Sequence, residues 1–109
     1  MAKIQLADFV KYGKLFDVYG KLLSEERQAL MSLYFNYNMT LAEISKEKGI
    51  SRQAVLDGIS KACLKLDEFE SKLNFNDKKE KFESKLKALK NFNSLDEIKE
   101  KVDEILGEI

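Results

Sequence analysis

Residues 40–59 read TLAEISKEKGISRQAVLDGI, and the helix starts and stops in this stretch decide the fold. Thr40 and Glu43 have the spacing of a capping box, in which the hydroxyl accepts from one backbone amide and the carboxylate accepts from the other. Gly49 supplies the left-handed conformation that ends a helix, and Ser51 is a preferred N-cap for the next helix. The stretch therefore predicts a short helix, a three-residue turn in which Ile50 is buried, and a second helix, which is the helix-turn-helix arrangement.

Before this motif, the spacing of apolar residues predicts two more helices. An aromatic-rich segment over 8–23 has one apolar face, with Asp8 as its expected N-cap and a turn expected near Gly20. Ser24 is the expected N-cap of the next helix, and two acidic residues follow it in the first turn. We expect Tyr37 to belong to the buried stripe of that second helix.

After the motif, the helix that begins at residue 52 is expected to continue to residue 73. At 1.5 Å per residue it is about 33 Å long, which is more than a four-helix core of this size covers. Its distal half is therefore expected to pack on something else. Its apolar residues recur at alternating steps of four and three: Val55, Ile59, Ala62, Leu66, Phe69 and Leu73.

The remainder of the chain predicts a charged helical arm. Residues 74–77 read Asn-Phe-Asn-Asp and mark a break, and Ser94 with Glu97 has the spacing of a second capping box. The fold class is therefore all-α with about six helices. We expect a helix-turn-helix domain over 1–73 and a helical C-terminal arm over 74–109. The arm's apolar positions are Phe82, Leu86, Leu89, Leu95, Ile98, Val102 and Ile105.

Composition narrows the function. The 109 residues contain no histidine and one cysteine, so histidine-based acid–base catalysis and most transition-metal sites are excluded. No glycine-rich phosphate loop is present, and we expect a protein that is not an enzyme and needs neither a cofactor nor a metal. The sequence also shows no segment apolar enough to span a membrane and no signal-peptide pattern, so we expect a cytoplasmic protein without integral membrane association.

The net charge is zero, but the charges are unevenly distributed. Residues 1–66 hold 10 basic and 7 acidic side chains, whereas residues 67–109 hold 9 basic and 12 acidic ones. A neutral total argues against a tight nonspecific binder of nucleic acid. The basic excess in the first part is still compatible with a modest phosphate-contacting face.

Residues 22–59, LLSEERQALMSLYFNYNMTLAEISKEKGISRQAVLDGI, resemble the helix-turn-helix of bacterial sigma-factor region 4. They resemble the YlxM family of small helix-turn-helix proteins more closely, and the LDEFESKL run at 66–73 also suits that family. The resemblance implies a DNA-binding-type fold in a bacterial cytoplasmic protein. Through gene neighbourhood with the signal recognition particle GTPases, it also implies an auxiliary role in protein targeting.

The first turns of the second motif helix are the expected nucleic-acid contact, because this end of a helix-turn-helix enters the major groove. Arginine can bond guanine and glutamine can bond adenine, whereas Asp57 at this end would repel phosphate. Two partners stay open: duplex DNA read by a sequence-specific transcriptional regulator, or the RNA or GTPases of the signal recognition particle. The candidate residues are Ser51, Arg52, Gln53 and Lys61, with Thr40 and Lys46 nearer the backbone.

The apolar residues that recur along the helix at 52–73 form a long seam, and this seam also predicts self-association. We expect a symmetric homodimer whose interface includes Ile59, Leu66, Phe69 and Leu73, together with the first helix and the arm. The alternative is that the C-terminal helices cover the seam within one chain. Cys63 beside the seam is expected to be a small buried hydrophobe.

Overall fold

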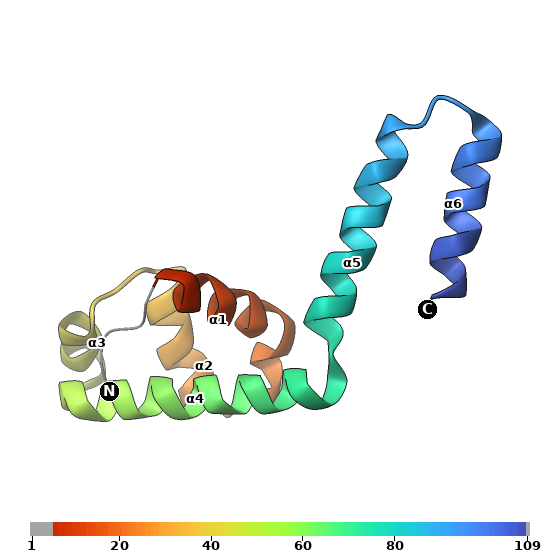
Figure 1. Ribbon diagram of the computed structural model, residues 1–109. Coiled ribbons are helices and arrows are strands. Elements are labelled where there is room, and N and C mark those ends of the chain that lie inside the picture. Colours follow the sequence, from red (N-terminus) through yellow and green to blue (C-terminus); the bar gives the residue numbers. More distant parts are fainter. Residues whose placement is uncertain (1–5, 109) are drawn as a thin grey trace. The chain divides into compact units, whose positions relative to one another are not determined.

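The computed structural model describes residues 6–108, and every regular element in that range is a helix (Figure 1). The all-α prediction is therefore confirmed. The chain divides into two compact units, Met1–Asn74 and Phe75–Ile109. The helices are α1 (Leu6–Tyr19), the 3-10 turn η1 (Gly20–Leu22), α2 (Glu25–Met31), the π-helical turn η2 (Ser32–Asn36), α3 (Leu41–Lys48), α4 (Arg52–Leu73), α5 (Phe75–Ala88), the 3-10 turn η3 (Leu89–Asn91) and α6 (Leu95–Gly107).

The capping residues set the bounds of α3 and α4 as the sequence predicts. The Thr40 backbone amide donates to Glu43 Oε1 at 3.0 Å, and the Glu43 amide donates to Thr40 Oγ1 at 3.1 Å. Gly49 ends α3 with a φ of 67°, and Ser51 Oγ accepts from the Ala54 amide at 3.0 Å. The helix-turn-helix is thus held by local hydrogen bonds before any tertiary packing is considered.

The core of the first unit lies along one face of α4. Figure 1 shows α1, α2 and α3 all lying on the same side of this helix. A Cβ on Gly58 would lie 2.6 Å from Leu30 Cδ1, so the glycine lets α2 pack close to α4. The largest fully buried side chains of the unit are Tyr19, Met31, Ile44, Ile59, Leu66 and Val55.

α1 covers the distal half of α4. The Tyr12 hydroxyl donates to Asp67 Oδ2 at 2.7 Å, and the Tyr19 hydroxyl donates to Glu70 Oε1 at 2.5 Å. Lys11 Nζ also lies 3.1 Å from Asp67 Oδ1. Within the first unit, the distal half of α4 therefore packs on α1 of the same chain.

The predicted dimer seam is corrected by this packing. Ile59 and Leu66 are 0% exposed in the single chain, because α1 and α2 already cover that face of α4. Phe69 is half-buried, with its ring 5.9 Å from that of Tyr19. Leu73 is exposed, so the predicted interface is wrong for Ile59 and Leu66, which belong to the core of one chain.

Three further expectations about single residues in the first unit differ from the structure. Asp8 lies inside the first turn of α1, which begins at Leu6, and is therefore not the N-cap. Tyr37 follows the end of η2 and is 72% exposed, because the π-helical turn changes the helical register before this position. Ile50, which the motif places in a buried turn, is 37% exposed.

The second unit is a helical hairpin with little buried surface. Ser94 Oγ accepts from the Glu97 amide at 3.4 Å, which is one half of the capping box expected there. Lys85 on α5 pairs with Glu108 at the end of α6. Among the described residues of this unit, Ile105 is the one buried apolar side chain. Within 6–108, no helix is both long enough and apolar enough to cross a bilayer.

Candidate nucleic-acid interface

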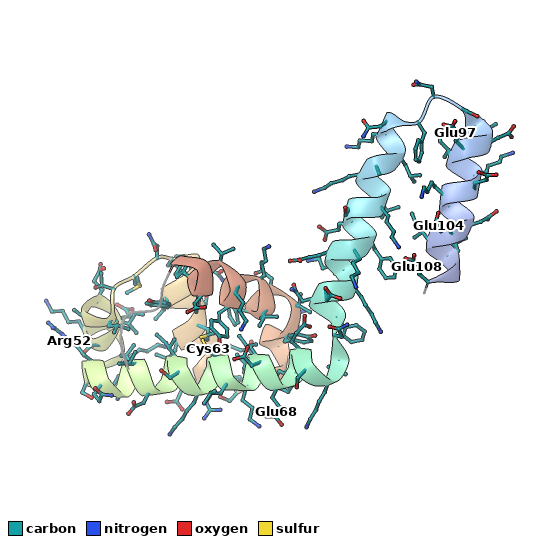
Figure 2. All side chains as sticks on the ribbon, in the orientation of Figure 1. Arg52, Cys63, Glu68, Glu97, Glu104 and Glu108 are labelled. Atoms are coloured by element: carbon teal, nitrogen blue, oxygen red, sulfur yellow. The ribbon has the colours of Figure 1, made fainter. Side chains whose placement is uncertain are left out.

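The N-terminus of α4 differs from the other helix starts in its charge. Five α-helices of the described range carry an acidic residue in the first turn, and α4 carries none. Arg52 is the first residue of α4 and is exposed, and Figure 2 shows it at this end of the helix beside α3. The acids that neutralise the other helix starts are Asp8, Glu25, Glu26, Glu43, Asp77, Asp96 and Glu97.

This arrangement leaves a positive helix end with a positive side chain. The first backbone amides of a helix carry partial positive charge, and acids in the first turn normally neutralise it. Ser51 Oγ takes one of these amides, that of Ala54, and no carboxylate in the first turn competes for the rest. Within 6–108, no ion pair engages Arg52. The site therefore suits an anionic group such as a phosphate.

Gln53 is exposed beside Arg52, but its side chain already has a partner. Its Nε2 donates to Asp57 Oδ1 at 2.9 Å, one turn along α4. To bond an adenine edge, the Gln53 amide would have to leave Asp57. Ala54 is exposed and offers only a methyl group. The helix start is thus better suited to a phosphate group than to base recognition.

Thr40 caps α3 and Lys46 lies on it, and the two differ in what they offer a nucleic acid. Thr40 is the N-cap, and its hydrogen bonds hold the pKa of the Glu43 carboxyl below its usual range. That carboxylate already occupies the positive end of α3, so this end disfavours phosphate. Lys46 is exposed two residues after the buried Ile44, on the outer side of α3, where it can meet a phosphate backbone.

Lys61 does not join the other candidates. It lies nine residues after Arg52, which corresponds to about 14 Å along α4 and half a turn around it. It is exposed on the outer face of α4, one turn beyond Asp57. The structure thus brings Ser51, Arg52 and Gln53 together and leaves Lys61 apart from them.

The sequence reasoning missed one cation of this region. Lys48 is the last residue of α3, is exposed, and comes directly before the turn that leads to α4. Its position between the two motif helices could have been read from the capping residues on either side. Lys48 adds a second positive charge, four residues before Arg52 in the sequence.

The described residues offer little for other chemistry. No group of three or more His, Cys, Asp or Glu side chains within 6–108 is placed to hold a metal ion. Cys63 is buried between α4 and the helices above it (Figure 2), and burial raises the pKa of its thiol to about 12. The thiol is therefore protonated at neutral pH and is a poor nucleophile.

Comparison with known proteins identifies the family. The family described as "Putative helix-turn-helix protein, YlxM / p13 like" matches residues 6–105. A UPF0122 protein of Clostridium perfringens is 42% identical over 100 residues, covering 87% of this chain and 89% of the relative. A second, from Clostridium kluyveri, is 36% identical over 83 residues, covering 76% of this chain and 75% of the relative. A third, from Fusobacterium nucleatum, is 34% identical over 85 residues, covering 78% and 82%. The chain with this positive helix end therefore belongs to the UPF0122 family of YlxM/p13-like helix-turn-helix proteins.

Proposed function

We propose that the protein binds nucleic acid through the first turn of α4 and acts as a regulatory protein in the cytoplasm. One observation carries the proposal: α4 is the one α-helix of the described range that has no acid in its first turn, and Arg52 stands there. Backbone amides, helix dipole and guanidinium then act together on a phosphate. In helix-turn-helix proteins this helix end is the one that faces the groove.

The residues beside Arg52 favour a phosphate contact of modest strength over strong base recognition. Gln53 bonds Asp57, and the Asp57 carboxylate repels phosphate. Lys46 and Lys48 add charge on α3, but each chain offers few such cations. We therefore expect binding that depends strongly on salt and weakly on base sequence.

A second candidate function is that of an accessory in the signal recognition particle pathway, contacting its RNA or its GTPases. The scarcity of free base-reading side chains at the start of α4 favours this candidate over a sequence-specific transcriptional regulator. An RNA backbone or an acidic protein surface needs only the charge of the site. The link to this pathway comes from the resemblance to YlxM proteins.

We also propose that the protein works as a symmetric homodimer. A pair of helix-turn-helix units doubles the number of cations that one nucleic acid can meet. The exposed apolar side chains of the second unit support self-association, because soluble monomers rarely expose several large ones together.

Titrations with three partners test the function. The full chain is titrated against duplex DNA of about 30 base pairs, signal recognition particle RNA and the GTPases of that particle, at about 50 and 200 mM salt. We expect nucleic-acid binding that weakens about fortyfold over this range if three phosphates are contacted. Preference among duplex sequences would support the transcriptional regulator, and preference for the particle's RNA or GTPases would support the accessory. Absence of binding to all three would overturn both candidates.

A further inference from the structure

The hairpin exposes one leucine of α5 and an apolar stripe of α6. Leu86 on α5 is 52% exposed, and Leu95, Val102 and Leu106 on α6 are also exposed. Phe82, Leu89 and Ile98 are half-buried and Ile105 is buried, so these residues form the inner face of the hairpin. A two-helix unit of this length has too few inward positions to bury its apolar side chains by itself.

Leu86 and the stripe of α6 lie on the same side of the hairpin. Leu86 follows the inward-facing Phe82 by four residues, and Val102 follows the inward-facing Ile98 by four residues. Each step of four turns a helix by about 40° in the same sense. Because α5 and α6 run antiparallel (Figure 1), equal turns direct Leu86 and Val102 to one face of the hairpin.

The two helices that share this face carry opposite charge. α5 (Phe75–Ala88) has five lysines and three acids, whereas α6 (Leu95–Gly107) has five acids and two lysines. An anionic partner such as nucleic acid or an acidic membrane would meet the acidic α6 as well as the basic α5. Because the two helices differ in the sign of their net charge, a second copy is favoured when it is turned so that each α5 lies against the α6 of the other copy.

We propose that this hairpin docks on the same hairpin of a second copy, apolar face to apolar face, with α5 of each copy against α6 of the other. A two-fold axis parallel to the helices produces this arrangement, in which every neighbouring pair is antiparallel and opposite in charge. A two-fold axis across the helices would place α5 on α5 and α6 on α6, which charge repulsion disfavours. The inference rests on the proposed homodimer and not on the nucleic-acid contact.

Light scattering of the full chain in solution tests the surface. We expect the wild type at about 50 µM to give twice the 12.6 kDa of the chain, and Leu86→Lys to give the monomer mass. Leu64→Lys is the matched control, because Leu64 is 68% exposed but lies on α4, outside the hairpin. Circular dichroism checks that each variant keeps its helix content. Leu95→Lys is the second variant for the same face.

The possible outcomes distinguish the existence of a dimer from the surface through which it forms. A monomeric wild type would overturn both the proposed homodimer and this inference. A dimeric wild type whose mass is unchanged in Leu86→Lys and Leu95→Lys would leave the homodimer standing and overturn this surface. Neither outcome concerns nucleic-acid binding, which the titrations measure separately.

Crosslinking tests the pairing of α5 with α6. Chains carrying Leu86→Cys are mixed with chains carrying Val102→Cys and oxidised, and Cys63 is buried and protonated in both. We expect disulfides mainly between the two kinds of chain, since the two copies of Leu86 lie diagonally across the bundle. Faster crosslinking of the Leu86→Cys chain with itself would overturn the arrangement.

Discussion

Gly58 and Gly13 both stand inside α-helices, but the space beside them differs. A Cβ at Gly58 would meet Leu30 Cδ1 at 2.6 Å, whereas one at Gly13 would lie 3.8 Å from Phe35 Cδ1. Alanine favours a helix over glycine by about 1 kcal/mol. At Gly58 this gain is outweighed, because Leu30 is buried and overpacking a core costs about 1–3 kcal/mol.

We therefore predict that Gly58→Ala destabilises the protein and Gly13→Ala stabilises it by up to about 1 kcal/mol. Urea unfolding followed by circular dichroism gives both free energies of unfolding. If Gly58→Ala raised the free energy of unfolding as Gly13→Ala does, the close packing of α2 on α4 would be wrong.

The burial of Cys63 predicts a pH effect on stability. Its folded pKa is about 12 against an ordinary value of 9.0, so the unfolded chain loses the thiol proton first as pH rises. The free energy of unfolding should therefore fall as pH rises from about 9 towards 12. Comparison with Cys63→Ala isolates this contribution from those of the tyrosines and lysines. An identical pH profile for both proteins would contradict the burial, as would rapid reaction of native Cys63 with a thiol reagent at pH 8.

At the scale of elements, the capping box predicts how α3 responds to Thr40→Ala. The substitution removes the hydroxyl that accepts from the Glu43 amide, whereas the backbone amide of residue 40 can still donate to the Glu43 carboxylate. We expect a loss of about 1 kcal/mol in the free energy of unfolding at neutral pH. Thr40→Ser keeps the hydroxyl and should therefore retain most of the stability that the cap contributes.

The same box predicts a pH dependence. The folded pKa of Glu43 is held below its ordinary value by its bonds to Thr40. Its contribution is therefore present above the ordinary pKa and is lost as pH falls through the folded pKa. The difference in free energy of unfolding between wild type and Glu43→Ala should therefore shrink in acid, and a difference that stayed constant would contradict the capping box.

The starts and ends of α3 and α4 were predictable from sequence because caps are local. Thr40, Gly49 and Ser51 act within four residues of themselves, and the structure agrees with each of them. Which helix covers the seam of α4 was not predictable in this way. Leu66 is buried because α1, some fifty residues earlier, lies across it, and helical spacing does not say which helix covers a stripe.

The candidate site was predictable in part for the same reason. Ser51, Arg52 and Gln53 follow one another at a helix start, so their shared location follows from the cap alone. The bond from Gln53 to Asp57 is also local, at one turn, and the sequence carried its signal. The separation of Lys61 from Arg52 by half a turn follows from helical geometry once the helix start is known.

At the scale of the whole molecule, we assign nucleic-acid binding to the first unit and self-association to the second. The first unit holds the positive helix start, and the second holds an apolar face formed by two helices of opposite net charge. A variant that separates the copies should therefore weaken nucleic-acid binding without altering the contact that each copy makes. Leu86→Lys provides that variant.

The most direct test of the central claim is the salt slope of nucleic-acid binding for wild type, Arg52→Ala and Lys21→Ala. Lys21 is an exposed lysine on η1, next to the end of α1 that contacts the distal half of α4, so its removal changes the net charge equally but away from the site. We predict that Arg52→Ala reduces the slope of log K against log salt by about one per site and that Lys21→Ala leaves it unchanged. Equal slopes for Arg52→Ala and wild type would contradict the claim that the first turn of α4 contacts phosphate.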